Sequence, residues 1–216
     1  MKNKTFFLTI ALVLIMTFSC KKDSTPEAKT IKSYSLTNIK NAYVQNTKCG
    51  IDLGHGKLYS VIEGQSFQDS IDIAYGYMTS SSRYERVFLS TSYAGCRCGG
   101  SSYFSYGDVN IPATGYSSYS VRNETKLYVA TSSVNFDSIA KAGTKSALDR
   151  YFPTDSYSTD EVFLASQDIL ITNPYIFFET VKGKRGIIRV KPFVRNVNTD
   201  YQYGENPVGI DVLVEK

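Results

Sequence analysis

The chain has 216 residues, with 24 lysines and arginines, 20 aspartates and glutamates, and a formal net charge of +4 at pH 7. This charge is too balanced for a nucleic-acid-binding protein, and no basic stretch rich in aromatic residues occurs, so nucleic acid is excluded as a partner. The length is sufficient for one hydrophobic core of ordinary size.

The first nineteen residues have the layout of a secretory signal peptide. Lys2 and Lys4 form a basic start, and the thirteen residues from Phe6 to Phe18 are predominantly apolar. A membrane-spanning helix needs roughly 20 apolar residues, so this run is too short to be an anchor by itself. Its length fits the apolar region of a cleaved signal, which predicts export.

Cys20 directly follows this run, after the small residue Ser19. The segment Thr17–Cys20 resembles a bacterial lipobox, in which the chain is cut before a cysteine that receives a diacylglyceryl thioether, although Thr17 and Phe18 depart from the usual pattern. We therefore expect lipid attachment at Cys20, which would anchor the protein in the membrane through two or three acyl chains. Ordinary signal cleavage with a leftover cysteine is the alternative.

Residues 20–33 are expected to form a flexible tether, because they are polar, contain a proline and hold one large apolar residue. Residues 34–216 are expected to form a single β-rich domain. The mature chain would carry 22 basic and 20 acidic residues once Lys2 and Lys4 are removed.

Runs rich in β-branched and aromatic residues, bounded by turn residues, predict the strands of this domain. In the run at 71–77, the alternation places Asp72 on the face opposite Ile71, Ile73 and Tyr75. The expected strands are 59–62, 71–77, 86–90, 126–131, a hairpin of 175–180 and 187–191 around VKGKRG, and 209–215, with Ile210, Val212 and Val214 on one face.

One stretch, near 135–152, predicts helix. Asn135 or Asp137 can cap it, and apolar residues recur at helical spacing. Gly143 lies in the middle, so one kinked helix and two short helices are both compatible with the sequence. The expected fold class is therefore α+β and predominantly β, with antiparallel sheets or a sandwich-like arrangement and one short helical region.

The order of several segments resembles that of uncharacterised cell-envelope lipoproteins of the Bacteroidetes. The segments are GKLYSV, SIDIAYGY, and the late hairpin GKRGIIRV after FFET. The resemblance implies a β-rich envelope module and supplies no active site. In that phylum a short stretch such as Lys21-Lys22-Asp23 after the lipidated cysteine can direct export to the cell surface. The implied location is the outer membrane.

Three cysteines, Cys49, Cys96 and Cys98, remain if Cys20 carries lipid. An odd number in an oxidising compartment predicts one disulfide from Cys49 to Cys96 or Cys98, with one thiol left over. Three free thiols and a zinc site that also uses His55 are the alternatives.

No catalytic motif is present, so we expect a protein that is not an enzyme, without cofactor or metal. His55, the only histidine, lies between two glycines in a predicted turn and is expected to be merely exposed. Asp69 and Asp72 have the residue types of a glycosidase pair, but their spacing in a predicted turn and strand favours solvated charges.

Tyrosine is concentrated between residues 75 and 119, where eight of the seventeen tyrosines occur. From residue 103 the neighbours are Ser, Gly, Asn and Thr, a composition typical of binding loops. We expect a binding surface at Tyr103, Tyr106, Tyr116 and Tyr119, for a glycan or a protein ligand. Tyrosines that simply pack on a β-sheet are the alternative. The expected role is a non-enzymatic binding or adhesion module, with an accessory subunit of an outer-membrane complex or a hydrolase as alternatives.

Overall fold

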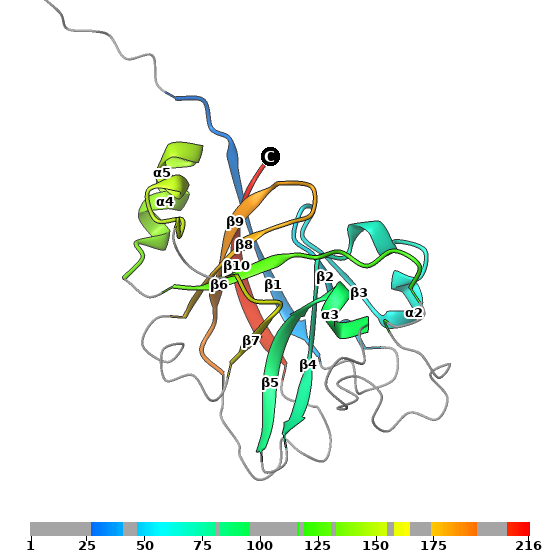
Figure 1. Ribbon diagram of the computed structural model, residues 1–216. Coiled ribbons are helices and arrows are strands. Elements are labelled where there is room, and N and C mark those ends of the chain that lie inside the picture. The colour runs from blue at the N-terminus through cyan, green and yellow to red at the C-terminus, as the bar shows by residue number, and fades with distance from the viewer. Residues whose placement is uncertain are drawn as a thin grey trace, which may run out of the picture.

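The computed structural model describes residues 27–40, 47–80, 83–95, 116, 119–130, 133–154, 158–164, 174–193 and 207–216 (Figure 1). The strands in these ranges are β1 (Ile31–Ile39), β2 (Gly50–Asp52), β3 (Lys57–Tyr59), β4 (Ile73–Ser80), β5 (Arg83–Ser90), β6 (Lys126–Val129), β7 (Glu161–Phe163), β8 (Tyr175–Glu179), β9 (Arg185–Val190) and β10 (Val208–Glu215). The helices are α2 (Val61–Gly64), the 3₁₀ turn η1 (Gln68–Ser70), α3 (Thr91–Gly95), α4 (Phe136–Ala142) and α5 (Lys145–Asp149).

The strands form two antiparallel sheets, which confirms the expected β-rich α+β class. The first sheet has the order β1-β10-β9-β8-β6, and the second has the order β3-β2-β4-β5-β7. Side chains of both sheets, such as Ile51 and Phe88 of the second and Ile188 and Val212 of the first, share one buried cluster. The molecule is therefore a sandwich whose main core lies between the sheets.

Alternation along β10 explains how the first sheet is covered on both faces. Ile210, Val212 and Val214 join the core between the sheets, as their period-two spacing predicts. Leu213 points to the other face, where it packs in a second cluster with residues of α4 and α5. The two helices therefore form an outer layer on the first sheet, next to the start of β1 (Figure 1).

The helical region consists of two short helices rather than one kinked helix. Asn135 caps α4, because its side chain accepts the backbone N–H of Ser138 at 3.0 Å. Gly143 ends α4 in the left-handed conformation, with φ of 66°, which glycine adopts without strain. Thr144 then caps α5 by accepting the N–H of Ala147.

Among the sequence-based boundaries that differ from the structure, two have a clear physical reason. The strand expected at 59–62 ends at Tyr59, because Ser60 and Glu63 form a capping box that starts α2. The tether expected to extend to residue 33 ends earlier, because β1 begins at Ile31 and pairs with β10 from Ile31 opposite Glu215. Ile31 is itself buried.

The chain is attached to the helical layer before β1 begins. Glu27 accepts hydrogen bonds from the Ser146 hydroxyl and backbone N–H. The carbonyl of Gly143 accepts both the Thr30 and the Ile31 N–H, at 2.8 and 2.9 Å. The fold thus holds the chain from Glu27 onward. Among the helices that the structure describes, none has the length and apolar character required to cross a membrane.

Candidate functional site

A third cluster of buried side chains covers the outer face of the second sheet. Tyr116 is fully buried and Tyr119 is 3% exposed, and their rings meet edge to face with centroids 5.1 Å apart. The Tyr119 hydroxyl donates to the carbonyl of Val61 at 2.7 Å, and the Tyr116 hydroxyl lies 3.3 Å from Cys49 Sγ. Burial raises the pKa of both phenols.

This burial corrects the expectation that Tyr116 and Tyr119 belong to an exposed binding surface. Both rings pack in the core, and the Tyr119 ring lies so close to Gly64 that a Cβ at that position would overlap its hydroxyl. Tyr103 and Tyr106, the other two tyrosines of the predicted surface, lie outside the described residues.

The structure also corrects the prediction that Cys49 forms a disulfide. Cys49 is a buried free thiol in contact with Tyr116, and burial raises its pKa to about 11. A thiol in this state is neutral and unreactive at neutral pH. Cys96 and Cys98, and the lipid-attachment candidate Cys20, lie outside the described residues. In the part of the chain that the structure describes, no three His, Cys, Asp or Glu residues gather as a metal site would require.

His55 lies in the turn between β2 and β3, as expected, but it is held by a buried carboxylate. Its Nδ1 lies 2.8 Å from Oδ2 of Asp52, and its backbone N–H donates to Oδ1 at 2.7 Å. The His55 side chain is 61% exposed, whereas that of Asp52 is 4% exposed. The carboxylate therefore fixes the ring and leaves most of it facing solvent.

Asp72 is buried beside this turn, which overturns the expectation of a solvated charge. Its Oδ2 accepts the N–H groups of Leu53 at 2.8 Å and Gly54 at 3.4 Å. Burial, followed by the nearby Asp52 carboxylate, raises the pKa of Asp72 to about 7, although the two backbone N–H groups oppose the shift. Asp72 therefore supports the turn and is not available to a ligand.

Two side chains of β1 fasten this turn to the first sheet. Tyr34 donates its hydroxyl hydrogen to the carbonyl of Leu53 at 2.6 Å, and Lys32 donates to the carbonyl of Gly54. The cluster of Asp52, His55 and Asp72 thus joins the two sheets along one side of the sandwich. The Asp52 and Asp72 carboxylates both accept backbone N–H groups of the turn, so their role is structural.

The exposed apolar side chains point to a different surface. Tyr59 and Phe67 stack with ring centroids 5.0 Å apart, and Phe67 is 48% exposed. Ile62 and Val121 are each 45% exposed. We call these four residues the Phe67 surface. Three of the four large apolar residues that are exposed in the described part of the chain belong to it, and the fourth is Val181.

Short polar contacts hold the Phe67 surface together. Gln68 accepts the backbone N–H of Val121 at 2.9 Å, and the neighbouring Tyr119 is bonded to α2 through Val61. Burial, and then the carboxylates of Asp52, Asp69 and Glu63, raise the pKa of Tyr59. The Tyr59 phenol is therefore within electrostatic range of three carboxylates, of which Asp52 is bonded to His55 and Glu63 is paired with Lys48.

The sequence reasoning missed this surface because Phe67 stands alone among polar residues, in EGQSFQDS. The signal that could have located it is Ser60–Glu63, which matches the capping-box pattern S-x-x-E and predicts a helix start after Tyr59. A helix there removes the following residues from the sheet. It places Ile62 and Phe67 in a short surface layer instead.

Comparison of the chain with protein-family models, curated proteins and solved structures finds no match in any of the three.

Proposed function

We propose that this protein is a lipid-anchored component of the cell envelope whose domain binds a ligand and does not catalyse a reaction. The anchor is supported by the export signal and by Cys20 directly after its apolar run. The resemblance to Bacteroidetes envelope lipoproteins supports an outer-membrane location.

The observation that carries the binding role is the exposed stack of Tyr59 and Phe67. An exposed Phe stacked on a half-buried Tyr offers a flat apolar face, and such faces stack on sugar rings. Glu63 Oε2 is already used by Lys48 and the Ser60 N–H, so the acceptors left for sugar hydroxyl groups are the Asp69 carboxylate and the other oxygen of Glu63. We therefore favour a glycan ligand at the Phe67 surface.

Membrane release tests the anchor. Cys20→Ser should move the protein from the membrane fraction to the soluble fraction of the cells that produce it, because no acyl chain can then be attached. A variant that stays in the membrane fraction at the wild-type level would contradict lipid attachment.

A glycan and peptide array, probed with the full-length chain in detergent, tests the binding surface. Phe67→Ser should weaken binding to the glycan hits by about thirtyfold. This factor corresponds to the binding free energy of about 2 kcal/mol that is lost when a hot-spot side chain is removed. Val181→Ser is the matched control, since Val181 is also exposed, at 57%, but lies in the β8–β9 turn. Equal affinity of both variants for the hits would refute the assignment, and hits among peptides alone would favour an accessory subunit.

A further inference from the structure

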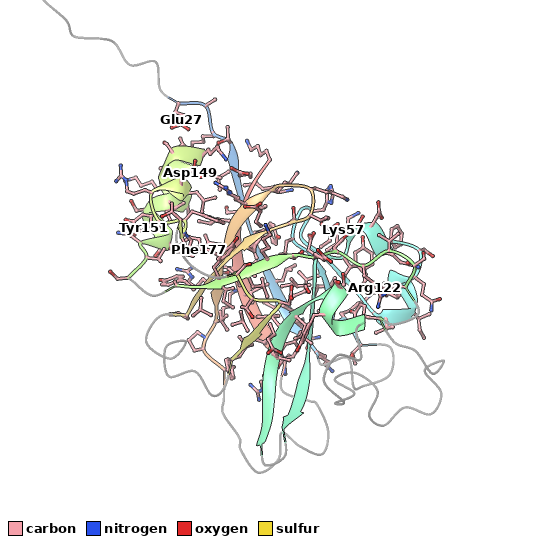
Figure 2. The ribbon with its side chains drawn as sticks, viewed as in Figure 1. Glu27, Lys57, Arg122, Asp149, Tyr151 and Phe177 are labelled. Atoms are coloured by element: carbon pink, nitrogen blue, oxygen red, sulfur yellow. The ribbon has the colours of Figure 1, made fainter. Side chains whose placement is uncertain are left out.

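The end of the domain that receives the tether is basic. We define this tether end as residues 27–30, 141–149, 179–185 and 215–216. Hydrogen bonds or ion pairs join all four ranges, including Thr30 to Gly143, Lys145 to Glu215 and the Arg185 N–H to Glu215. Figure 2 shows Glu27 and Asp149 on this end, whereas Lys57 and Arg122 lie toward the second sheet.

Seven basic residues stand in these ranges against four acidic ones, a net charge of +3. The acidic side chains are engaged within the fold. Glu179 pairs with Arg185 at 3.1 Å, Glu215 pairs with Lys145, and Asp149 lies within 4.0 Å of both cations. Glu27, as described above, accepts from Ser146.

Five of the seven basic residues lack an ion-pair partner in the described part of the chain, although the Lys216 ammonium donates to the carbonyl of Lys29 at 2.9 Å. Among the described residues, none forms an ion pair with Lys29, Lys141, Lys182, Lys184 or Lys216. Lys29, Lys141 and Lys182 are exposed. The positive charge of the tether end is therefore not neutralised by the acidic residues beside it.

Val181 adds an apolar contact at the same end. It is the most exposed large apolar residue in the described part of the chain, at 57%, and it stands in the β8–β9 turn directly before Lys182. An exposed aliphatic side chain followed by two lysines, Lys182 and Lys184, is suited to the boundary between lipid headgroups and acyl chains.

The length of the tether keeps this end close to the anchor. Cys20 precedes Glu27 by seven positions, and an extended chain spans at most about 3.6 Å per residue, so their separation is at most about 25 Å. Lys21 and Lys22 lie within this span. The opposite end of β1 is farther away by the length of a nine-residue strand, about 30 Å.

We propose that the tether end lies against an anionic phospholipid surface, with Val181 at the headgroup boundary and the lysines in contact with lipid phosphates. This inference rests on the proposed lipid anchor, which places the domain at a membrane. Each basic residue near an anionic surface strengthens attachment about fivefold, so the patch reinforces the acyl chains and gives the domain one preferred orientation. In that orientation the end of β4 and the start of β5 lie on the side of the domain away from the membrane (Figure 1).

Lysine footprinting of the full-length protein on vesicles tests this orientation. The membrane-bound protein is reconstituted in phosphatidylcholine vesicles with or without phosphatidylglycerol, treated with a lysine-acylating reagent, and mapped by mass spectrometry. At about 0.1 M salt, labelling of Lys29, Lys141 and Lys182 should slow about fivefold on the anionic vesicles alone. The slowing should vanish at about 1 M salt, where the screening length is about 3 Å. Lys40 and Lys48, which lie together beyond the far end of β1, are internal controls whose labelling should not change.

Charge-neutralised variants give an independent test. Lys141→Gln with Lys182→Gln should restore labelling of Lys29 on anionic vesicles, whereas Lys40→Gln with Arg122→Gln, which removes the same charge elsewhere, should not. Labelling that is equal on both kinds of vesicle, or protection of Lys40 and Lys48 together with the others, would overturn the proposed orientation.

Flotation of the full-length protein with vesicles tests the lipid anchor and the basic tether end separately. Flotation with neutral vesicles supports the lipid anchor by itself. Flotation with anionic vesicles alone, reversed by salt and accompanied by the footprint above, would refute the anchor and support the basic face. Failure to float with either kind of vesicle would overturn both.

Discussion

Asp72→Asn should change how the stability of the domain depends on pH. The pKa of Asp72 is about 7 in the fold against 3.8 as the ordinary value. Because the folded-state pKa is raised, the contribution of this group to stability is fully present below about pH 4 and is lost as the pH rises to 7. The difference between the two pKa values corresponds to about 4 kcal/mol of unfolding free energy. Asparagine stays neutral, and its Oδ1 can still accept the Leu53 N–H.

The free energy of unfolding should therefore be measured in urea from pH 4 to pH 8 for both proteins. The chain has no tryptophan and seventeen tyrosines, so tyrosine fluorescence is a suitable signal. The stability of Asp72→Asn relative to the wild type should rise by about 4 kcal/mol across this range. Asp69→Asn, at an exposed carboxylate three residues earlier, is the control and should follow the wild-type curve. A constant difference between Asp72→Asn and the wild type at every pH would refute the reasoning.

Three further substitutions test packing and capping, with unfolding free energies as the measurement. Gly186→Ala should destabilise the domain by about 3 kcal/mol, since a Cβ there would overlap a ring of β8 and a carbonyl of β10. Gly183→Asn, at an open position with φ of 75°, should cost less than about 0.5 kcal/mol, and equal losses for the two variants would contradict this reasoning. Tyr119→Phe should cost about 1.5 kcal/mol, because the buried carbonyl of Val61 loses its donor, and an unchanged stability would mean that the bond is not formed. Ser60→Ala should cost about 1 kcal/mol through loss of the helix cap, and no loss would show that α2 forms without it.

The elements that the sequence predicted well are those whose partners are near in the chain. The hairpin of β8 and β9 turns at Gly183, and its register, with Tyr175 opposite Arg189, follows from the short connection. Alternation in β10 identified Ile210, Val212 and Val214 as one face, because the period of two follows from the strand itself and needs no knowledge of its partner. Asn135, one of two proposed caps, starts α4.

The errors concern contacts between distant segments. Tyr116 and Tyr119 have the polar neighbours of a binding loop, yet they are buried because the sheet strands β2 and β4 and helix α2 leave an apolar face that they cover. Asp72 occupies an outward position in its strand pattern, but the turn after β2 lies over it and supplies N–H donors. Composition indicates what a side chain can do, whereas burial depends on which segments meet it.

The pairing of β1 with β10 has a mechanical consequence for a tethered domain. The register runs antiparallel from Ile31 opposite Glu215 to Ile39 opposite Val208. When a bound ligand pulls the domain away from its anchor, the load first meets the contacts of Glu27 and Thr30 with the helical layer and then passes along β1 from Ile31. The hydrogen bonds to β10 lie across that direction, so they are loaded in shear and must break together. A strand peeled from its other end, at Ile39, would instead release its bonds one at a time. The domain should therefore resist a pull on its tether more strongly than a pull applied at the far end of the same strand.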